Sequence, residues 1–205
     1  ASDVYKRQDP KLLIDEFGLD YIRYFLLREI TLGSDGNFAR INLVNRINSE
    51  LCNKIGNLFQ RVLAFIYKQF NGVISFNCVD ELYAQELLVT ASKLPQTFNQ
   101  HIKKFQLHYI LDDIINLADQ ANKYIDEMAP WKLIKTDAAA AQRTLSTLLE
   151  VMRYVAISLQ PFIPHSASKM LEQLGIADNQ RSFAALTPEY AIKQLHLLEA
   201  PTPIF

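Results

Sequence analysis

Apolar residues recur every three or four positions along almost the whole chain. This spacing matches the turn of an α-helix and gathers apolar side chains on one face. Only 6 of the 205 residues are glycine, and the alternating pattern of strands is hard to find. With 49% apolar residues, a chain of this length can bury a large core. The pattern therefore predicts an all-α protein, built as a helical bundle.

Capping residues, glycines and prolines predict where the helices begin and end. Asp9 and Pro10 favour a helix start, Gly18 favours its end, and Asp20 and Asp137 are candidate caps of later helices. The expected helices span residues 10–17, 21–30, 41–70, 81–105, 107–128, 138–160 and 164–174, and an irregular tail over residues 181–205 packs back on them.

The long helix predicted over residues 41–70 has one apolar stripe. At 100° per residue, the stripe consists of Val44, Ile47, Leu51, Ile55, Leu58, Val62 and Phe65. Asn57 and Arg61 are four residues apart, so they share a face, and they lie at the edge of this stripe. Such a position packs the stem of a side chain and leaves its polar head free. The two residues could hold a ligand at a fixed angle, or they could form a solvated flank.

The single tryptophan, Trp131, follows Ala129 and Pro130 in the stretch "QANKYIDEMAPWKLIK". Pro130 is expected to end the preceding helix and to open a short turn. A tryptophan at such a junction can be a core residue or an exposed platform for a flat ligand. Both interpretations are open at this point.

The charge and the cysteines limit the classes of function. The formal net charge is -1, so no global positive field attracts nucleic acid, and an RNA site would be a local patch that contacts bases. Cys52 and Cys78 form no CxxC pair and have apolar neighbours, which favours reduced thiols and a cytoplasmic location. No apolar run approaches the ~18 residues of a membrane span.

The residues that could carry catalysis or hold a metal do not form a pattern. His101, His108 and His165 lack the spacing of metal ligands. Asp112, Asp113 and the stretch "YIDE" have no nucleophile or glycine-rich loop to complete a site, so they are interpreted as solvated helix faces. We therefore expect neither a catalytic residue nor a metal ligand in this chain.

Three stretches, in this order and at this spacing, resemble the C-terminal part of methionyl-tRNA synthetases of the bacterial or mitochondrial type. They are "DPKLLIDEFGLDYIRYFLLREITLGSDGNFA", "LVNRINSELCNKIGNLFQR" and "ANKYIDEMAPWKLIK". The resemblance covers most of residues 9–175 and reaches the tail through "PTPIF". The combination of "GNLFQR" and "APW" separates it from the synthetases for valine, isoleucine, leucine and cysteine.

The resemblance implies two parts and a site. Residues 9–40 would be a stem-contact segment, and residues 41–205 a helical bundle of the class I synthetase anticodon-binding type with an irregular tail. Asn57, Arg61 and Trp131 match the family's anticodon-contacting residues, so the implied partner is the anticodon loop of tRNA(Met). Trp131 would stack on an unstacked base, while Asn57 and Arg61 would bond the edge of that base.

The resemblance also implies a catalytic half that would precede residue 9. That half would bind ATP, with zinc as a further candidate, and it would be the second partner of this chain. No cofactor is expected in the chain itself, which alone should not activate methionine. Residues 1–8 do not resemble the family and are interpreted as a cloning scar or an unrelated leader.

Two other readings stay open from the residues alone. One is the anticodon-binding bundle of a different class I synthetase. The other is a helical adaptor that binds protein partners through a groove. The oligomeric state and the choice between initiator and elongator tRNA are likewise left open by the sequence.

Overall fold

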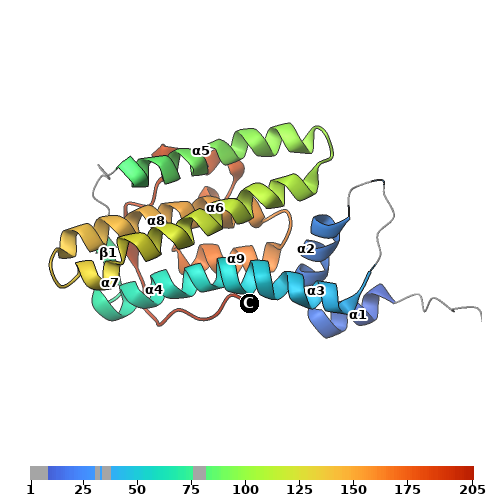
Figure 1. Cartoon of the computed structure of the whole chain (residues 1–205), viewed down its shortest axis with the longest axis horizontal. Helices are drawn as coiled ribbons and strands as arrows, with labels where there is room; N and C mark the ends of the chain where they lie inside the picture. Colours follow the sequence, from blue (N-terminus) through green and yellow to red (C-terminus); the bar gives the residue numbers. More distant parts are fainter. Residues whose placement is uncertain (1–8, 31–32, 34–37, 76–81) are drawn as a thin grey trace, which may run out of the picture.

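The chain folds into a bundle of helices that lie side by side (Figure 1). The structure is a computed structural model that describes residues 9–30, 33, 38–75 and 82–205, and the predicted all-α class is confirmed. The helices are α1 (Pro10–Phe17), α2 (Leu19–Glu29), α3 (Arg40–Arg46), the π-helical η1 (Ile47–Gly56), α4 (Asn57–Gln69), α5 (Leu82–Ile102), α6 (Leu107–Met128), α7 (Pro130–Leu133), α8 (Ala138–Leu159) and α9 (Pro164–Gln173). The predicted leader and Cys78 lie outside the described residues.

Helix α8 is the centre of the bundle. It packs against α4, α5, α6 and α9, and 17 of its 22 residues are buried, as expected for a helix covered on all sides. Asp137 is its N-cap, as predicted, and accepts a hydrogen bond from the backbone N–H of Ala140 at 2.9 Å. The buried hydroxyl of Thr144 donates to the carbonyl of Ala140 at 3.0 Å, so the polar group is satisfied inside the core.

The segments α3, η1 and α4 form one continuous helix from Arg40 to Gln69, close to the predicted bounds. Because a π-helix closes its hydrogen bonds over five residues, each residue turns by less than 100°. The stripe drawn at 100° steps is therefore only partly right. Val44 is 36% exposed and Leu43 is buried in its place, while Phe65 is partly buried. The buried members of the predicted stripe are Ile47, Leu51, Ile55, Leu58 and Val62.

Two short strands form a small sheet that the sequence did not indicate. Strand β1 (Val73–Ser75) follows α4, and strand β2 (Gln194–His196) lies in the tail. They pair antiparallel, with buried Ile74 opposite buried Leu195. Each strand has only three residues, too few for an alternating pattern to stand out. The tail otherwise contains the 3-10 turns η2 (Asp178–Gln180), η3 (Phe183–Ala185) and η4 (Pro188–Tyr190).

A buried arginine attaches the tail to the central helix. Arg153 of α8 is 1% exposed, and its guanidinium donates to the backbone carbonyls of Ala185 and Thr187 in the tail. It also pairs with Glu150 one turn earlier, at 2.6 Å. A buried charge must be paired and hydrogen-bonded to be tolerated. The tail therefore packs back, as predicted, through polar as well as apolar contacts.

Asp20 caps a different helix from the one predicted. Helix α2 begins at Leu19, directly after Gly18, whose φ of +93° suits glycine. Asp20 consequently lies inside α2, where its buried carboxylate accepts a hydrogen bond from the backbone N–H of Ser166 at 2.7 Å. Ser166 is in the first turn of α9, whose own N-cap residue, Ile163, has no side-chain acceptor. Asp20 therefore supplies the missing cap from another helix.

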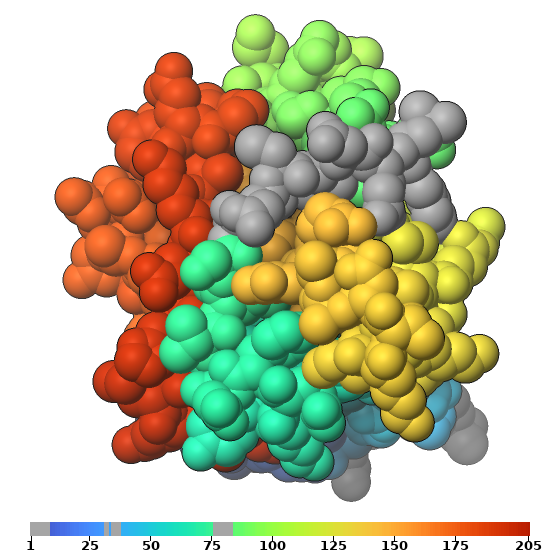
Figure 2. Space-filling model, turned by 90° about the vertical axis from the view of Figure 1, so that its left-hand side faces the viewer, coloured from blue at the N-terminus to red at the C-terminus, as the bar shows by residue number. Residues whose placement is uncertain are grey.

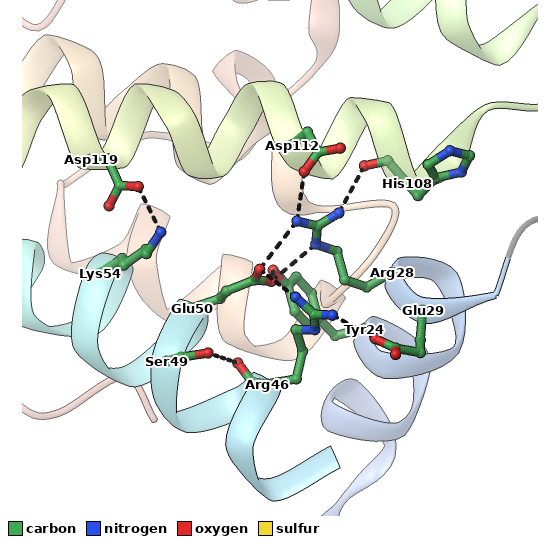
Figure 3. Close-up of polar contacts among 10 residues, drawn as sticks. All are labelled: Tyr24, Arg28, Glu29, Arg46, Ser49, Glu50, Lys54, His108, Asp112 and Asp119. Carbon is green, nitrogen blue, oxygen red and sulfur yellow. Dashed lines mark hydrogen bonds and ion pairs between the residues drawn. The ribbon is translucent and has the colours of Figure 1, made fainter. Parts of the chain in front are cut away.

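A buried carboxylate on η1, Glu50, joins three helical segments (Figure 3). It accepts hydrogen bonds from the Tyr24 hydroxyl at 2.6 Å and from Nε of Arg28 at 3.1 Å, both on α2. It also accepts one from Nη1 of Arg46 at 3.0 Å. Arg28 in turn pairs with Asp112 of α6 at 2.6 Å. The prediction that Asp112 belongs to a solvated face is therefore wrong, since it anchors α2 to the bundle.

These contacts change the ionisation of Glu50. Burial by itself would raise the pKa of Glu50, but hydrogen bonds from Arg28 and Tyr24 and the charges of Arg28 and Arg46 outweigh it and lower the pKa. Burial and the same carboxylate raise the pKa of Tyr24 well above its ordinary value. The cluster is therefore charged on Glu50 and neutral on Tyr24 near neutral pH.

Replacing Glu50 by Gln should lower the free energy of unfolding by about 3–5 kcal/mol at pH 7, because two arginines lose a buried partner. The native pKa of Glu50 is below that of the unfolded chain. The stabilisation is thus complete above about pH 4.3, the ordinary glutamate value, and is lost as the pH falls below it. Urea unfolding at several pH values measures this. Glu127→Gln, which alters an exposed pair, is the control. A difference that stays constant down to pH 3 would contradict the assignment.

Replacing Asp20 by Ala should destabilise the protein by about 1–3 kcal/mol, since a buried N–H at the start of α9 loses its acceptor. Chemical unfolding followed by circular dichroism measures the change. Asp15→Ala removes the same charge from an exposed position on α1 and should change the stability little. Equal stabilities of the two variants would argue against a cap from Asp20.

Candidate nucleic-acid interface

Two of the three predicted site residues meet at one end of the bundle. Arg61 lies on α4 and Trp131 on α7, which lie at the same end in Figure 1. The guanidinium carbon of Arg61 is 5.5 Å from the centroid of the Trp131 ring, within the range of a cation–π contact. Figure 2 faces this end, with the last turns of α4 (teal) beside α7 and the start of α8 (gold).

The backbone between α6 and α7 positions Trp131. Ala129 has a left-handed conformation, with φ of +44°, which ends α6 and costs about 1–2 kcal/mol for a residue with a Cβ. Its carbonyl accepts a hydrogen bond from the backbone N–H of Lys132 at 2.8 Å. Pro130 opens α7, as predicted, and is buried. With Pro130 buried in this one-turn helix, the next residue, Trp131, lies at the surface.

Trp131 is 38% exposed, so it is neither sealed in the core nor free in solvent. Part of the indole packs against the protein, and part remains accessible. Of the two interpretations that the sequence left open, the exposure favours a platform over a core residue.

An ion pair orients Arg61 beside the indole. Nη2 of Arg61 lies 2.5 Å from Oδ1 of Asp126 on α6. Asp126 is 61% exposed at its side chain, so the pair contributes at most about 1 kcal/mol to stability. Its main effect is on the direction of the guanidinium, which keeps further N–H donors for a ligand. Sequence reasoning missed Asp126 because its partner is 65 residues away in the chain.

Asn57 lies on the same helix as Arg61, one turn earlier. It is exposed and begins α4, about 6 Å from Arg61 along the axis. In the described part of the chain, its side-chain amide has no hydrogen-bond partner. Asn57 can therefore donate to and accept from a ligand on this surface.

Two lysines add local positive charge next to the indole. Lys132 and Lys135 are both exposed and follow Trp131 in the chain. They suit the phosphates of a nucleic acid, and they do so on a protein whose net charge is only -1. Their position directly after the tryptophan was the available signal in the sequence, but it did not single them out.

The described residues bring together an aromatic face, hydrogen-bond donors and positive charge, and this combination suits binding. Among these residues, no three His, Cys, Asp or Glu side chains gather in a way that could hold a metal ion. None of the helices in the described ranges is long and apolar enough to cross a bilayer.

Two protein-family models match the chain. The model of the anticodon binding domain of methionyl tRNA ligase matches residues 83–205, which include Trp131. The model of class I tRNA synthetases of the (M) type matches residues 8–63, which include Asn57 and Arg61. The three predicted site residues therefore lie within the matched regions.

Curated relatives and solved structures agree with these models. The methionine–tRNA ligase of Rickettsia felis is 51% identical over 200 residues, which are 96% of this chain and 39% of that protein. The ligase of Caldanaerobacter subterraneus is 41% identical over 180 residues, 87% of this chain and 28% of that protein. Methionyl-tRNA synthetase from Mycobacterium tuberculosis, in complex with methionyl-adenylate, superimposes with a TM-score of 0.91 at 37% identity, over 96% of this chain and 39% of that one.

The chain thus spans about two fifths of the length of the first of these relatives. The anticodon-domain model alone covers more than half of the chain. The chain therefore belongs to the methionyl-tRNA ligase family and contains the anticodon-binding domain of that family.

Proposed function

We propose that this chain binds the anticodon loop of tRNA(Met) at the surface formed by Trp131, Arg61 and Asn57. The observation that carries the proposal is the half-exposed indole of Trp131 with the Arg61 guanidinium 5.5 Å from its ring centroid. This pair lies in a chain that belongs to a family of anticodon-binding proteins. Proteins read RNA sequence mainly in single-stranded loops, where the bases can be splayed out.

Trp131 would hold one anticodon base by stacking. Aromatic stacking of an unpaired base contributes about 1–3 kcal/mol and accepts any base. The contact therefore supplies affinity, while the identity of the base must be read by polar groups at its edge. Lys132 and Lys135 lie close enough in the chain to contact the flanking phosphates.

Arg61 would read the first anticodon base as cytosine. The Watson–Crick edge of cytosine offers two acceptors, at its ring nitrogen and its carbonyl, whereas uracil has an N–H donor at that nitrogen. The guanidinium of Arg61 only donates, so it matches cytosine and opposes uracil. Asp126 holds the guanidinium from the other side and limits its reorientation.

The longer protein that contains this chain would join methionine to tRNA(Met) in the cytoplasm, using ATP. Its catalytic half would bind ATP and is a candidate for zinc. Residues 9–40 would contact the tRNA stem, and the bundle would dock the anticodon. The support for this proposal is the similarity to methionine–tRNA ligases that are more than twice as long as this chain.

Replacing Trp131 by Ala should weaken binding of an RNA hairpin with the methionine anticodon by about 5- to 150-fold, the loss of one stacked base. Fluorescence anisotropy measures the affinity. The melting temperature should stay nearly constant, because the ring is already 38% exposed. Phe105→Ala removes a more exposed aromatic from the α5–α6 connection and is the matched control. A fall in melting temperature with unchanged RNA affinity would identify Trp131 as a packing residue only.

Exchanging the first anticodon cytosine for uracil should weaken binding about tenfold, because the N–H of uracil faces the donors of Arg61. In the Arg61→Gln variant the preference should disappear, since an amide can donate or accept. Arg40→Gln changes an exposed arginine at the start of the same continuous helix and should keep the preference. Equal affinity of the unmodified protein for both hairpins would count against the proposed readout.

A further inference from the structure

A polar hollow of about 550 Å³ lies next to the Arg61–Trp131 pair. Asn53, Asn57 and Gln60 line it from the long helix, and Pro203 and Phe205 line it from the C-terminal end of the chain. Figure 1 shows this end of the chain beside the middle of the long helix. The volume falls within the range of pockets that hold small ligands.

Asn57 connects the hollow to the surface around Trp131. It lines the hollow and lies one turn before Arg61, which faces the indole. The two sites are therefore about one helical turn apart. A nucleotide in the hollow would be a neighbour of the one stacked on Trp131.

The lining of the hollow is suited to an uncharged ligand with mixed donors and acceptors. In the described part of the chain, the amides of Asn53, Asn57 and Gln60 form no hydrogen bonds, so each can donate and accept. None of the lining residues is acidic or basic. Burial raises the pKa of the Cys52 thiol, which keeps this lining residue neutral as well. Asn and Gln side chains pair well with base edges, whereas a phosphate would require positive charge.

Phe205 adds an aromatic wall that depends on a glycine. A Cβ added at Gly56 would lie 3.1 Å from Cδ2 of Phe205, so the bare backbone of Gly56 allows the ring to lie against the helix. The ring is also 6.3 Å from that of Tyr21 on α2, and Phe205 remains partly exposed. The ring is thus held in place and keeps an accessible part.

We propose that this hollow is a second base-binding subsite, which holds a base next to the one stacked on Trp131. Asn53 and Gln60 bond the edge of that base, and Phe205 forms its apolar wall. The inference rests on the proposed function, because it assigns the hollow to another nucleotide of the same anticodon loop.

The test combines protein variants with hairpins that lack one base. Gln60→Ala and Asn53→Ala change exposed side chains, so neither should disturb the fold. Gln69→Ala is the matched control, since it lies on the same helix, nine residues on and about 180° around the axis. The RNA probes are the methionine-anticodon hairpin and three versions of it, each with an abasic site at one anticodon position.

On the intact hairpin, Gln60→Ala and Asn53→Ala should each weaken binding by about threefold to tenfold, the usual loss of a hydrogen bond to a ligand. This loss should vanish on the hairpin that lacks the second or the third anticodon base. It should persist on the hairpin that lacks the first, which belongs to Trp131. Phe205→Leu, which keeps the apolar bulk but removes the flat face, should follow the same pattern. Gln69→Ala should bind every hairpin like the unmodified protein.

The outcomes separate the two proposals. If Trp131→Ala weakens binding but the Asn53, Gln60 and Phe205 variants bind every hairpin normally, only the second subsite is overturned. A loss that is the same on all abasic hairpins also overturns it, because the effect then does not come from a base. If the unmodified protein does not bind the hairpin at all, the proposed function fails, and the subsite fails with it.

Discussion

The arrangement of the bundle depends on one buried carboxylate. Glu50 accepts hydrogen bonds from α2 and from the first turns of the long helix, and Arg28 extends the same network to α6. A lone charge at this depth would be unstable, so the three segments must meet for Glu50 to be satisfied. The network therefore specifies how the N-terminal helices sit on the bundle, which apolar packing alone would leave less defined.

The long helix connects this network to the candidate RNA surface. Glu50 lies on its π-helical segment, while Asn57 and Arg61 lie on the α-helical turns that follow. No loop interrupts the helix between them, so a rotation at one end is carried to the other as a rigid body. The π-helical segment also sets which side chains face outward beyond it, because its smaller turn per residue shifts the faces of α4 relative to α3. The positions of the site residues are thus coupled to the packing of α2.

Local signals in the sequence were enough to predict most helices, since Asp9, Asp137 and Pro130 act where their chemistry suggests. Features that depend on distant partners could not be predicted in this way. Asp20 caps a helix that begins 144 residues later, at Pro164, and the β1–β2 pair joins segments far apart in the chain. The site divides along the same line: the resemblance identified Asn57, Arg61 and Trp131, whereas Asp126 and the Phe205 wall required tertiary structure.

The junction at Ala129 joins α6 and α7 without a linker. The direction of the indole is consequently set by the dihedral angles of one strained residue, with no flexible segment to absorb an error. Inserting or deleting a single residue here would turn the ring by about 100° around the short helix. Among homologous chains, this junction should therefore tolerate substitutions more readily than changes in length, unlike an ordinary surface loop.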